Sequence, residues 1–369
     1  MRAVHANFVR PPDHADPDRL LEEWPTLLDV AEATANAGVE STLLQSFGRD
    51  AAIERRGVRC QFVEEPALPG SWSGMTPWRI AQAAVRTGAD VIHVNGLDFP
   101  THTRAMCKSG IPVLAQDHAS RPGGRRRLRR WGLAGIAGAA FTDIEQAKAF
   151  REEGSLSSEV PIFAVPESSS RFRTGDQAEA QAATGISGSP ALLWVGRLDE
   201  NKDPLTMLDA FELAVSDLSD AHLWCCYHEQ PLLDAVKARI AQSPALISRV
   251  HLLGRVPHER VELLCRAADI FVAASHREGS GYALIEALAC GTTPVLSDIP
   301  SFRRLGGDVA ALAPVGDARS LATAIISTAR KPKAELRQRT VEHFASNLSF
   351  RAVGARLREI YRALAPAAA

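Results

Sequence analysis

The feature that most constrains this chain of 369 residues is the alternation of short apolar runs with segments of helical period from one end to the other. The apolar runs have the length of strands, and the segments between them place apolar side chains three to four residues apart. This alternation predicts parallel sheets wrapped by helices, and therefore an α/β fold. The expected strands are residues 3–9, 40–44, 59–63, 91–94, 112–115, 139–142 and 162–165 in the first half, and 191–195, 222–226, 250–253, 270–273 and 293–296 in the second.

The length of the chain indicates two domains, because a single hydrophobic core stops growing below this size. A polar stretch rich in Ser, Gly, Gln and Thr begins at Glu167 and ends at Pro190, between the two series of strands. We predict an N-terminal Rossmann-like domain over residues 1–170, a linker over 171–190 and a C-terminal Rossmann-like domain over 191–348. A final helix within 349–369 is expected to pack back on the N-terminal domain.

The composition sets limits on function and location. With 42 basic against 43 acidic residues, the chain has no excess charge for nucleic acid, and we predict no nucleic-acid partner. The six cysteines form no C-x-x-C pair, so they are interpreted as reduced core residues. Because neither a signal peptide nor a membrane-length apolar run is visible, we expect a cytoplasmic protein, with peripheral docking on the inner membrane face as an option.

The first group of candidate site residues follows the expected strand 191–195. Gly196 lets the chain turn off the strand end, and the cations Arg197 and Lys202 then bracket the start of the next helix. Helix-start amides and the helix dipole also attract anions, so the place suits a diphosphate. Taken alone, an equally good interpretation is that both cations pair with acidic neighbours on a solvated loop.

The second group follows the expected strand 270–273. Gly279 and Gly281 expose backbone amides at a helix start, and Glu286 lies inside that helix, roughly 7 to 10 Å along its axis from the loop that carries Glu278. Two carboxylates so placed could hold hydroxyl groups at opposite ends of a ligand. The alternative, favoured for an isolated pair of this spacing, is that Glu278 caps the helix and Glu286 pairs with an arginine such as 303 or 304.

Together the two groups resemble family 4 of the retaining glycosyltransferases, which have the GT-B fold of two Rossmann-like domains facing a central cleft. The motifs are Gly-Arg-Leu-x3-Lys-Asp-Pro and, about 75 residues later, Glu-Gly-x-Gly-x4-Glu-Ala-x-Ala-Cys-Gly-x2-Pro-Val. The resemblance implies that Arg197 and Lys202 hold the donor diphosphate, Glu286 the ribose and Glu278 the transferred sugar. The implied donor-binding set is Gly196, Arg197, Lys202, Arg255, Glu278, Gly279, Ser280, Gly281, Tyr282 and Glu286.

Residues 90–96 and 112–118 resemble two strands of the same family's N-terminal domain, the second of which ends in His118. The resemblance gives His118 a role toward the sugar or the acceptor; without it, fixing a loop is the more common role for such a histidine. The implied function is transfer of a hexose from a nucleotide-diphosphate sugar to a hydroxyl acceptor in polysaccharide, glycolipid or other glycoconjugate synthesis. Arg197, Lys202, Glu278 and His118 are the candidate catalytic residues. No cofactor or essential metal is expected, because cationic side chains meet the phosphate charge and no carboxylate pair follows a strand in the arrangement of a metal site.

Two features depart from this pattern or add to it. The family usually has a Gly-Gly loop after its first strand, whereas residues 7–18 contain no glycine, which leaves a non-catalytic sugar-nucleotide-binding or scaffold protein as the alternative function. Arg125, Arg126, Arg127, Arg129 and Arg130 form a basic run beside Trp131. The run could contact an anionic membrane or a phosphorylated acceptor, although a solvated helix start is the commoner meaning of such a run.

Overall fold

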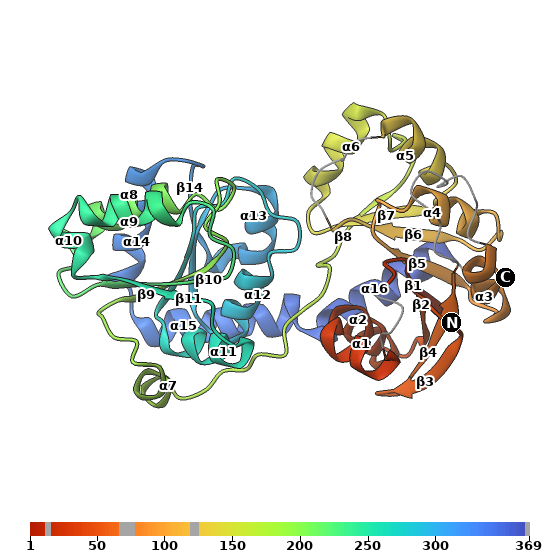
Figure 1. The fold of residues 1–369 in the computed structure, drawn as a ribbon, viewed down its shortest axis with the longest axis horizontal. Helices are drawn as coiled ribbons and strands as arrows, with labels where there is room; N and C mark the ends of the chain where they lie inside the picture. The colour runs from red at the N-terminus through yellow and green to blue at the C-terminus, as the bar shows by residue number, and fades with distance from the viewer. Residues whose placement is uncertain (12–15, 66–77, 119–124, 366–369) are drawn as a thin grey trace. The chain divides into compact units, whose positions relative to one another are not determined.

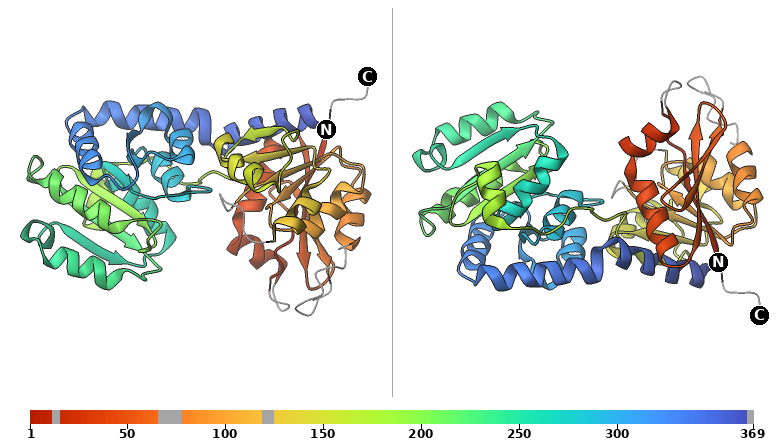
Figure 2. Two further views of the ribbon diagram at one scale, coloured as in Figure 1. Left: turned by 90° about the horizontal axis from the view of Figure 1, so that it is seen from above. Right: turned by 90° about the horizontal axis from the view of Figure 1, so that it is seen from below.

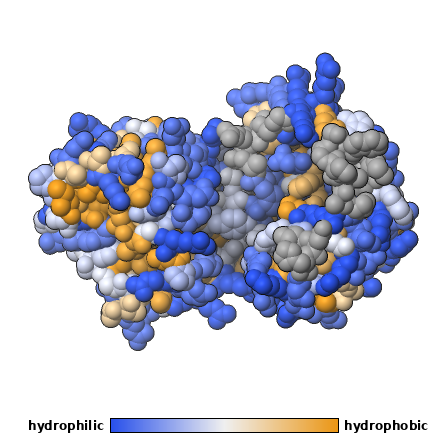
Figure 3. All heavy atoms as spheres, in the orientation of Figure 1, coloured by the Kyte–Doolittle hydropathy of each residue, from blue (hydrophilic) through white to orange (hydrophobic). Residues whose placement is uncertain are grey.

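The computed structural model describes residues 1–11, 16–65, 78–118 and 125–365, and it has the predicted α/β fold (Figure 1). The chain divides into two compact units. Unit 1 consists of Met1–Ser169 together with Phe350–Ala369, and unit 2 is Ser170–Ser349. Each unit is built on one sheet with helices on both of its faces (Figure 2). On the face drawn in Figure 3, hydrophilic side chains cover most of the surface, as expected when the apolar ones fill two cores.

The sheet of unit 1 has eight strands, and all neighbouring pairs are parallel except the pair at one edge. That edge is the β3–β4 hairpin, which the pattern of apolar runs did not predict, because β3 is short and largely exposed. In sheet order the strands are β3 (Ala51–Arg55), β4 (Val58–Glu64), β2 (Glu40–Phe47), β1 (Arg2–Asn7), β5 (Val91–Asn95), β6 (Val113–Gln116), β7 (Gly138–Phe141) and β8 (Ile162–Ala164).

Successive side chains of β1 belong to different cores, since a strand alternates its two faces. Val4 and Ala6 pack with the helices α3 (Trp78–Arg86), α4 (Pro100–Cys107), α5 (Arg126–Leu133) and α6 (Ala147–Glu153). Ala3 packs on the opposite face with α2 (Pro25–Asn36) and α16 (Phe350–Leu364), beside α1 (Pro17–Glu23). The last helix of the chain is therefore part of unit 1.

The sheet of unit 2 has six parallel strands, in the order β11 (Val250–Gly254), β10 (His222–Tyr227), β9 (Ala191–Gly196), β12 (Ile270–Ala273), β13 (Thr293–Ser297) and β14 (Ala311–Ala313). One face is covered by α8 (Pro204–Val215), α9 (Leu233–Ala241), α10 (Pro244–Ile247) and α14 (Ala318–Ala329). The other is covered by α7 (Gln177–Thr184), α11 (His258–Ala267), α12 (Tyr282–Ala289) and α13 (Pro300–Gly306), next to α15 (Lys333–His343).

The stretch 171–190, expected to be a linker, instead belongs to unit 2 and contains α7. Asp176 caps this helix by accepting a hydrogen bond from the backbone of Glu179 at 2.9 Å, and Gly185 ends it in the left-handed region. Ala180 and Phe172 are buried against α11 and its neighbours. The polar composition of this stretch suggested a linker because α7 is mostly solvent-facing, with Ala180 as its one buried residue.

Candidate functional site

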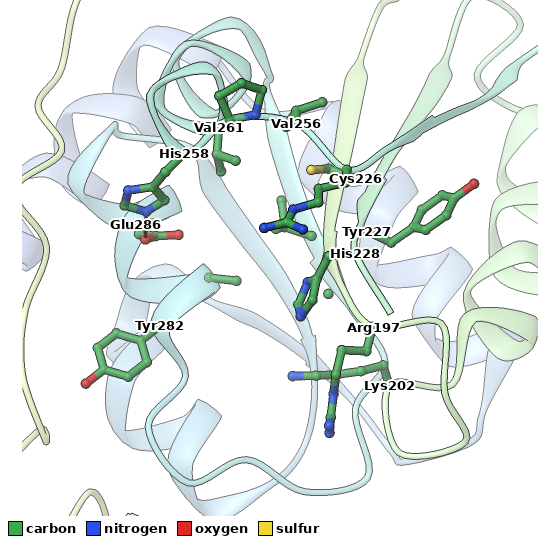
Figure 4. A pocket seen from close by; sticks show the side chains of 15 residues that line it. Arg197, Lys202, Cys226, Tyr227, His228, Val256, His258, Val261, Tyr282 and Glu286 are labelled. Carbon is green, nitrogen blue, oxygen red and sulfur yellow. Dashed lines mark hydrogen bonds and ion pairs between the residues drawn. The ribbon is translucent and has the colours of Figure 1, made fainter. Parts of the chain in front are cut away.

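A pocket of about 860 Å³ lies within unit 2, beyond the carboxyl ends of β9, β10 and β11 and beside the start of α12 (Figure 4). This is the position at which open parallel sheets bind ligands. Its size is within the range of pockets that hold a cofactor-sized molecule. The lining residues are Val195, Gly196, Arg197, Lys202, Cys226, Tyr227, His228, Arg255, Val256, Pro257, His258, Val261, Tyr282, Ala283 and Glu286.

One end of the pocket is cationic. Figure 4 shows Arg197 and Lys202 together there, on the loop between β9 and α8. A Cβ atom at Gly196 would lie 3.2 Å from the Trp194 ring. Glycine at this position therefore lets the backbone pass close to the buried indole where the strand ends. Asp203 accepts a hydrogen bond from the Thr206 amide at 3.1 Å and so caps α8. The loop is therefore fixed at both ends, which holds the two cations at the strand end.

The two cations differ in their partners. Arg197 is half exposed and lies 3.1 Å from Asp199 and 3.6 Å from Glu229, as the solvated-loop alternative supposed. Lys202 does not pair with these neighbours: its ammonium group is hydrogen-bonded to the carboxylate of Glu278, from the loop after β12. Ser275 donates to the same Glu278 oxygen at 2.8 Å. The structure thus joins the two sequence motifs through one ion pair.

The loop between β12 and α12 holds Glu278, whose side chain is largely buried. Glu278 does not cap α12. The N-cap is Gly281, with φ of +64°, a conformation that favours glycine, and a Cβ atom there would lie 2.5 Å from the Leu305 side chain. Glu278, Gly279, Ser280 and Gly281 do not line the pocket as the structure describes it. Glu278 reaches the pocket through Lys202.

The opposite end of the pocket holds a second carboxylate pairing. Glu286 does not pair with Arg303 or Arg304, which was the alternative from sequence; Arg303 pairs with Asp298 instead, at 2.8 Å. The partner of Glu286 is His258, whose Nε2 atom lies 2.7 Å from Oε1 (Figure 4). That hydrogen bond raises the pKa of the His258 imidazole, against the opposing effect of desolvation.

His258 also contacts an aromatic ring on its other side. The Phe172 ring centroid lies 4.8 Å from that of His258, so the segment before α7 supports the imidazole that holds Glu286. Sequence reasoning missed His258, Tyr227 and His228 in the pocket lining. Tyr227 and His228 stand where the predicted strand 222–226 ends, which was a usable signal; nothing local distinguished His258 from other exposed histidines.

The pocket wall also includes the buried thiol of Cys226. Burial raises the pKa of Cys226, and the negative charge of Glu286 raises it further. The described chain has six free cysteines, five of them buried, and no disulfide. The raised pKa of Cys226 keeps its thiol protonated at neutral pH, so this residue serves as a packing group of the pocket wall.

His118 belongs to unit 1, just after β6. Its Nδ1 atom is paired with the carboxylate of Glu167, which is almost fully buried. The Nε2 atom of His118 is buried and has no hydrogen-bond partner among the described residues. A carboxylate on one ring nitrogen fixes the imidazole and leaves the other nitrogen for a ligand.

The basic run splits into two kinds of arginine. Arg129 is buried, with its guanidinium 3.3 Å from both Glu153 and Asp98, so the prediction that it contacts a membrane is wrong. It lies on the inward face of α5, together with Gly132 and Leu133, and this face packs against the rest of unit 1. The other arginines of the predicted run are exposed: Arg125, Arg126, Arg127 and Arg130.

Within the described residues no three His, Cys, Asp or Glu side chains gather as they would to hold a metal, so the expectation of no essential metal stays a prediction. Among the helices that the structure describes, none is long and apolar enough to cross a membrane.

Residues 176–344 match the family described as glycosyl transferases group 1. The chain is 27% identical to phosphatidyl-myo-inositol mannosyltransferase of Mycobacterium leprae over 267 residues, which is 68% of this chain and 67% of that protein. It is 26% identical over 233 residues to GDP-mannose:cellobiosyl-diphosphopolyprenol alpha-mannosyltransferase of Xanthomonas oryzae, covering 61% and 60% of the two chains. The matched parts thus span about three fifths to two thirds of these relatives.

Two solved structures share the fold over nearly the whole chain. Sucrose-phosphate synthase of Thermosynechococcus elongatus is 18% identical, with a TM-score of 0.66 and full coverage of both chains. A protein of Anabaena, solved in complex with UDP and glucose, is 17% identical, with a TM-score of 0.67 and coverage of 98% and 99%. The predicted GT-B architecture and the resemblance to family 4 glycosyltransferases are confirmed.

Proposed function

Because this chain belongs over residues 176–344 to the group 1 glycosyl transferases, we propose that it transfers a sugar from a nucleotide-diphosphate sugar to a hydroxyl acceptor with retention of configuration. The observation that carries the proposal is the pocket of unit 2, which has Arg197 and Lys202 at one end and the mostly buried carboxylate of Glu286 at the other. In a sugar nucleotide the diphosphate and the ribose hydroxyls lie at different points along the ligand. The cations would face the diphosphate, and the carboxylate would face the ribose hydroxyls.

In the proposed complex, Arg197 and Lys202 bind the diphosphate. The Lys202–Glu278 pair supports this assignment, because it places a carboxylate beside the cation that would hold the phosphate nearest the sugar. Glu278 would accept hydrogen bonds from the sugar hydroxyls while Lys202 neutralises the phosphate. Glu286 would accept from the ribose hydroxyls, with His258 fixing the orientation of its carboxylate.

Charge stabilisation is the main catalytic effect in this proposal. As the bond between the sugar and the phosphate breaks, negative charge develops on the leaving diphosphate, and preorganised cations and helix-start amides stabilise it. His118, held by Glu167, would offer Nε2 to a hydroxyl of the sugar or the acceptor. The acceptor hydroxyl forms its bond to the sugar as the sugar–phosphate bond breaks, and its proton passes to an oxygen of the leaving diphosphate, so no protein carboxylate needs to act as acid or base.

The acceptor is proposed to be a hydroxyl group on a glycoconjugate, polysaccharide or lipid-linked sugar. By their names, two relatives act on phosphatidyl-myo-inositol and on cellobiosyl-diphosphopolyprenol, which are lipid-linked acceptors.

The exposed arginines 125, 126, 127 and 130 of this chain support a peripheral contact with anionic lipid. Changing the four to Gln should abolish binding to phosphatidylglycerol vesicles; unchanged binding would exclude that contact.

The function is tested by incubating the whole chain with UDP-, GDP- and ADP-linked hexoses and following slow hydrolysis of each donor without acceptor. The expected result is turnover of one donor class, lost in Glu286→Gln and kept in Glu335→Gln, a substitution of an exposed carboxylate on α15. Nucleotide binding without turnover of any donor would favour the non-catalytic alternative that the glycine-free segment 7–18 suggests. Residues 12–15 of that segment lie outside the described residues.

A further inference from the structure

The two loops that meet at the Lys202–Glu278 ion pair are also joined by three hydrogen bonds that involve neither charged side chain. The first loop lies between β9 and α8, and the second lies between β12 and α12. Because β9 and β12 are neighbours in the sheet of unit 2, the two loops leave the sheet side by side. The three bonds therefore bear directly on the position of Lys202 against Glu278.

Asn201, immediately before Lys202, makes two of these bonds. Its backbone carbonyl accepts from the His276 amide at 2.8 Å, and its side-chain amide donates to the carbonyl of Arg277 at 3.0 Å. The backbone bond is available to any residue, whereas the side-chain bond requires a donor at this position. The second loop is thus held at the two positions directly before Glu278.

Asp203, immediately after Lys202, makes the third bond. The Nε2 atom of His276 lies 3.0 Å from Oδ2 of Asp203, and since a carboxylate accepts, the imidazole donates. The backbone of Asp203 has φ of +46°, a left-handed conformation that a non-glycine residue keeps only when its surroundings hold it there. The His276 bond and the cap of α8 supply that restraint.

The second loop is anchored to the sheet as well as to the first loop. Ser297, the last residue of β13, donates from its hydroxyl to the carbonyl of Ser275 at 2.6 Å, and Ser275 donates to Glu278 at 2.8 Å. Glu278 is therefore oriented from within its own loop. The three bonds between the loops, which we call the loop clamp, fix where the first loop places Lys202 against it.

The side chains of Asn201 and His276 contribute little to packing or to the pocket wall. The His276 side chain is 46% exposed, and Oδ1 of Asn201 is buried without a hydrogen-bond partner among the described residues. A buried acceptor without a partner costs about as much as one hydrogen bond contributes, so the Asn201 side chain gives the fold little net stability. Neither residue lines the donor pocket as the structure describes it. The loop clamp therefore acts on the placement of the two loops.

We propose that Asn201 and His276 are positioning residues of the sugar transfer, which hold Lys202 and Glu278 at one fixed separation before the donor binds. The inference rests on the proposed function, in which Lys202 meets the diphosphate and Glu278 meets the sugar. The bond that breaks joins those two groups, so a shift of one loop against the other misplaces a charge at one end of that bond. A misplacement of about 1 Å can lower a rate on the order of 100-fold.

The test compares Asn201→Ala and His276→Ala with wild type in donor hydrolysis and in calorimetric binding of UDP and GDP. We expect each variant to lower kcat about tenfold or more. The KM for the donor and the Kd for the nucleotide should stay within about threefold of wild type, because Arg197 and Glu286 remain in place. His276→Gln, which keeps an N–H donor for Asp203, should recover most of the loss.

The matched controls are Asn347→Ala and His222→Ala, which remove hydrogen-bonded side chains of the same kind elsewhere in unit 2 and should keep the wild-type kcat. The melting temperatures of Asn201→Ala and His276→Ala should lie within about 2 °C of wild type. A kcat near wild type in either variant would overturn the inference. So would a loss of kcat that runs parallel to a lower melting temperature and weaker nucleotide binding, because that is the signature of a purely structural role.

A second measurement does not depend on turnover. Amide hydrogen exchange over residues 276–281 should be faster in Asn201→Ala than in wild type and unchanged in Asn347→Ala, because the second loop loses one of its bonds to the first. If exchange is faster but wild type hydrolyses no donor, the proposed function fails and the loop clamp is confirmed. If Asn201→Ala hydrolyses a donor as fast as wild type, the positioning role fails and the proposed function stands.

Discussion

At the residue scale, the donor pocket depends on single contacts between distant positions. Lys202 and Glu278 are 76 positions apart in the sequence, and His258 and Glu286 are 28 apart. In each pair a cationic or titratable group holds a carboxylate that is mostly buried. Removing Lys202 or His258 would leave a mostly buried carboxylate without its partner, which costs more than the pair itself contributes.

We expect Arg197→Ala to lower donor turnover on the order of 100-fold, because the guanidinium would stabilise charge on the leaving diphosphate. Arg197→Lys should lose less, since it keeps the charge without the fork geometry. Steady-state kinetics measure both, with Arg304→Ala, an exposed arginine of α13, as the control. A turnover number of Arg197→Ala close to wild type would exclude the assignment.

The His258–Glu286 pair gives a prediction for the pH dependence of stability. The pKa of His258 is raised in the folded protein, so the contribution of the pair is fully present below the unfolded pKa of about 6.5. It is lost as the pH rises through the folded pKa. The melting temperature of His258→Gln should thus fall below wild type most at about pH 5, and the difference should shrink toward about pH 9. In a Glu286→Gln background the pH-dependent part should vanish; a difference independent of pH would contradict the pair.

At the element scale, α16 is held by close backbone packing and by one buried hydrogen bond. Tyr361 and His93 are joined at 2.7 Å between the hydroxyl and Nδ1. Burial, with the nearby His118 charge, lowers the pKa of His93 to about 3, so the imidazole stays neutral. A Cβ atom at Gly354 would lie 2.1 Å from the carbonyl oxygen of Ala33 on α2. Only glycine therefore lets the two helices approach this closely.

Gly354→Ala should destabilise unit 1 by about 1–3 kcal/mol or more, because the backbone of α2 cannot move as a side chain can. Urea unfolding measures the loss. Arg351→Ala, an exposed position in the same helix, should change stability by less than about 0.5 kcal/mol. Equal stabilities for Gly354→Ala and wild type would mean that α16 does not pack on α2 in solution.

At the scale of the whole molecule, the chain leaves unit 1 after Ser169 and returns to it at Phe350. A nucleotide that binds only unit 2 stabilises that unit by mass action. We expect UDP or GDP to slow amide hydrogen exchange in β9, β10 and α12. Exchange in α16 should change as little as exchange in β1 and β5, which belong to the same unit. Glu286→Gln is the control that should show no nucleotide effect. Slowing of α16 together with unit 2 would contradict the division.

The alternation of apolar runs determined the α/β class and most strand positions, because strand and helix periods are properties of local sequence. It also indicated where Gly196 and Arg197 lie, since residues that follow a parallel strand lie at its carboxyl end. Only the tertiary structure decided that Lys202 meets Glu278, that His258 holds Glu286 and that Glu167 holds His118. It also decided that Arg129 is buried and that α7 belongs to unit 2. These contacts join segments far apart in sequence, and they are set by how helices and loops pack on the sheets, which no local pattern records.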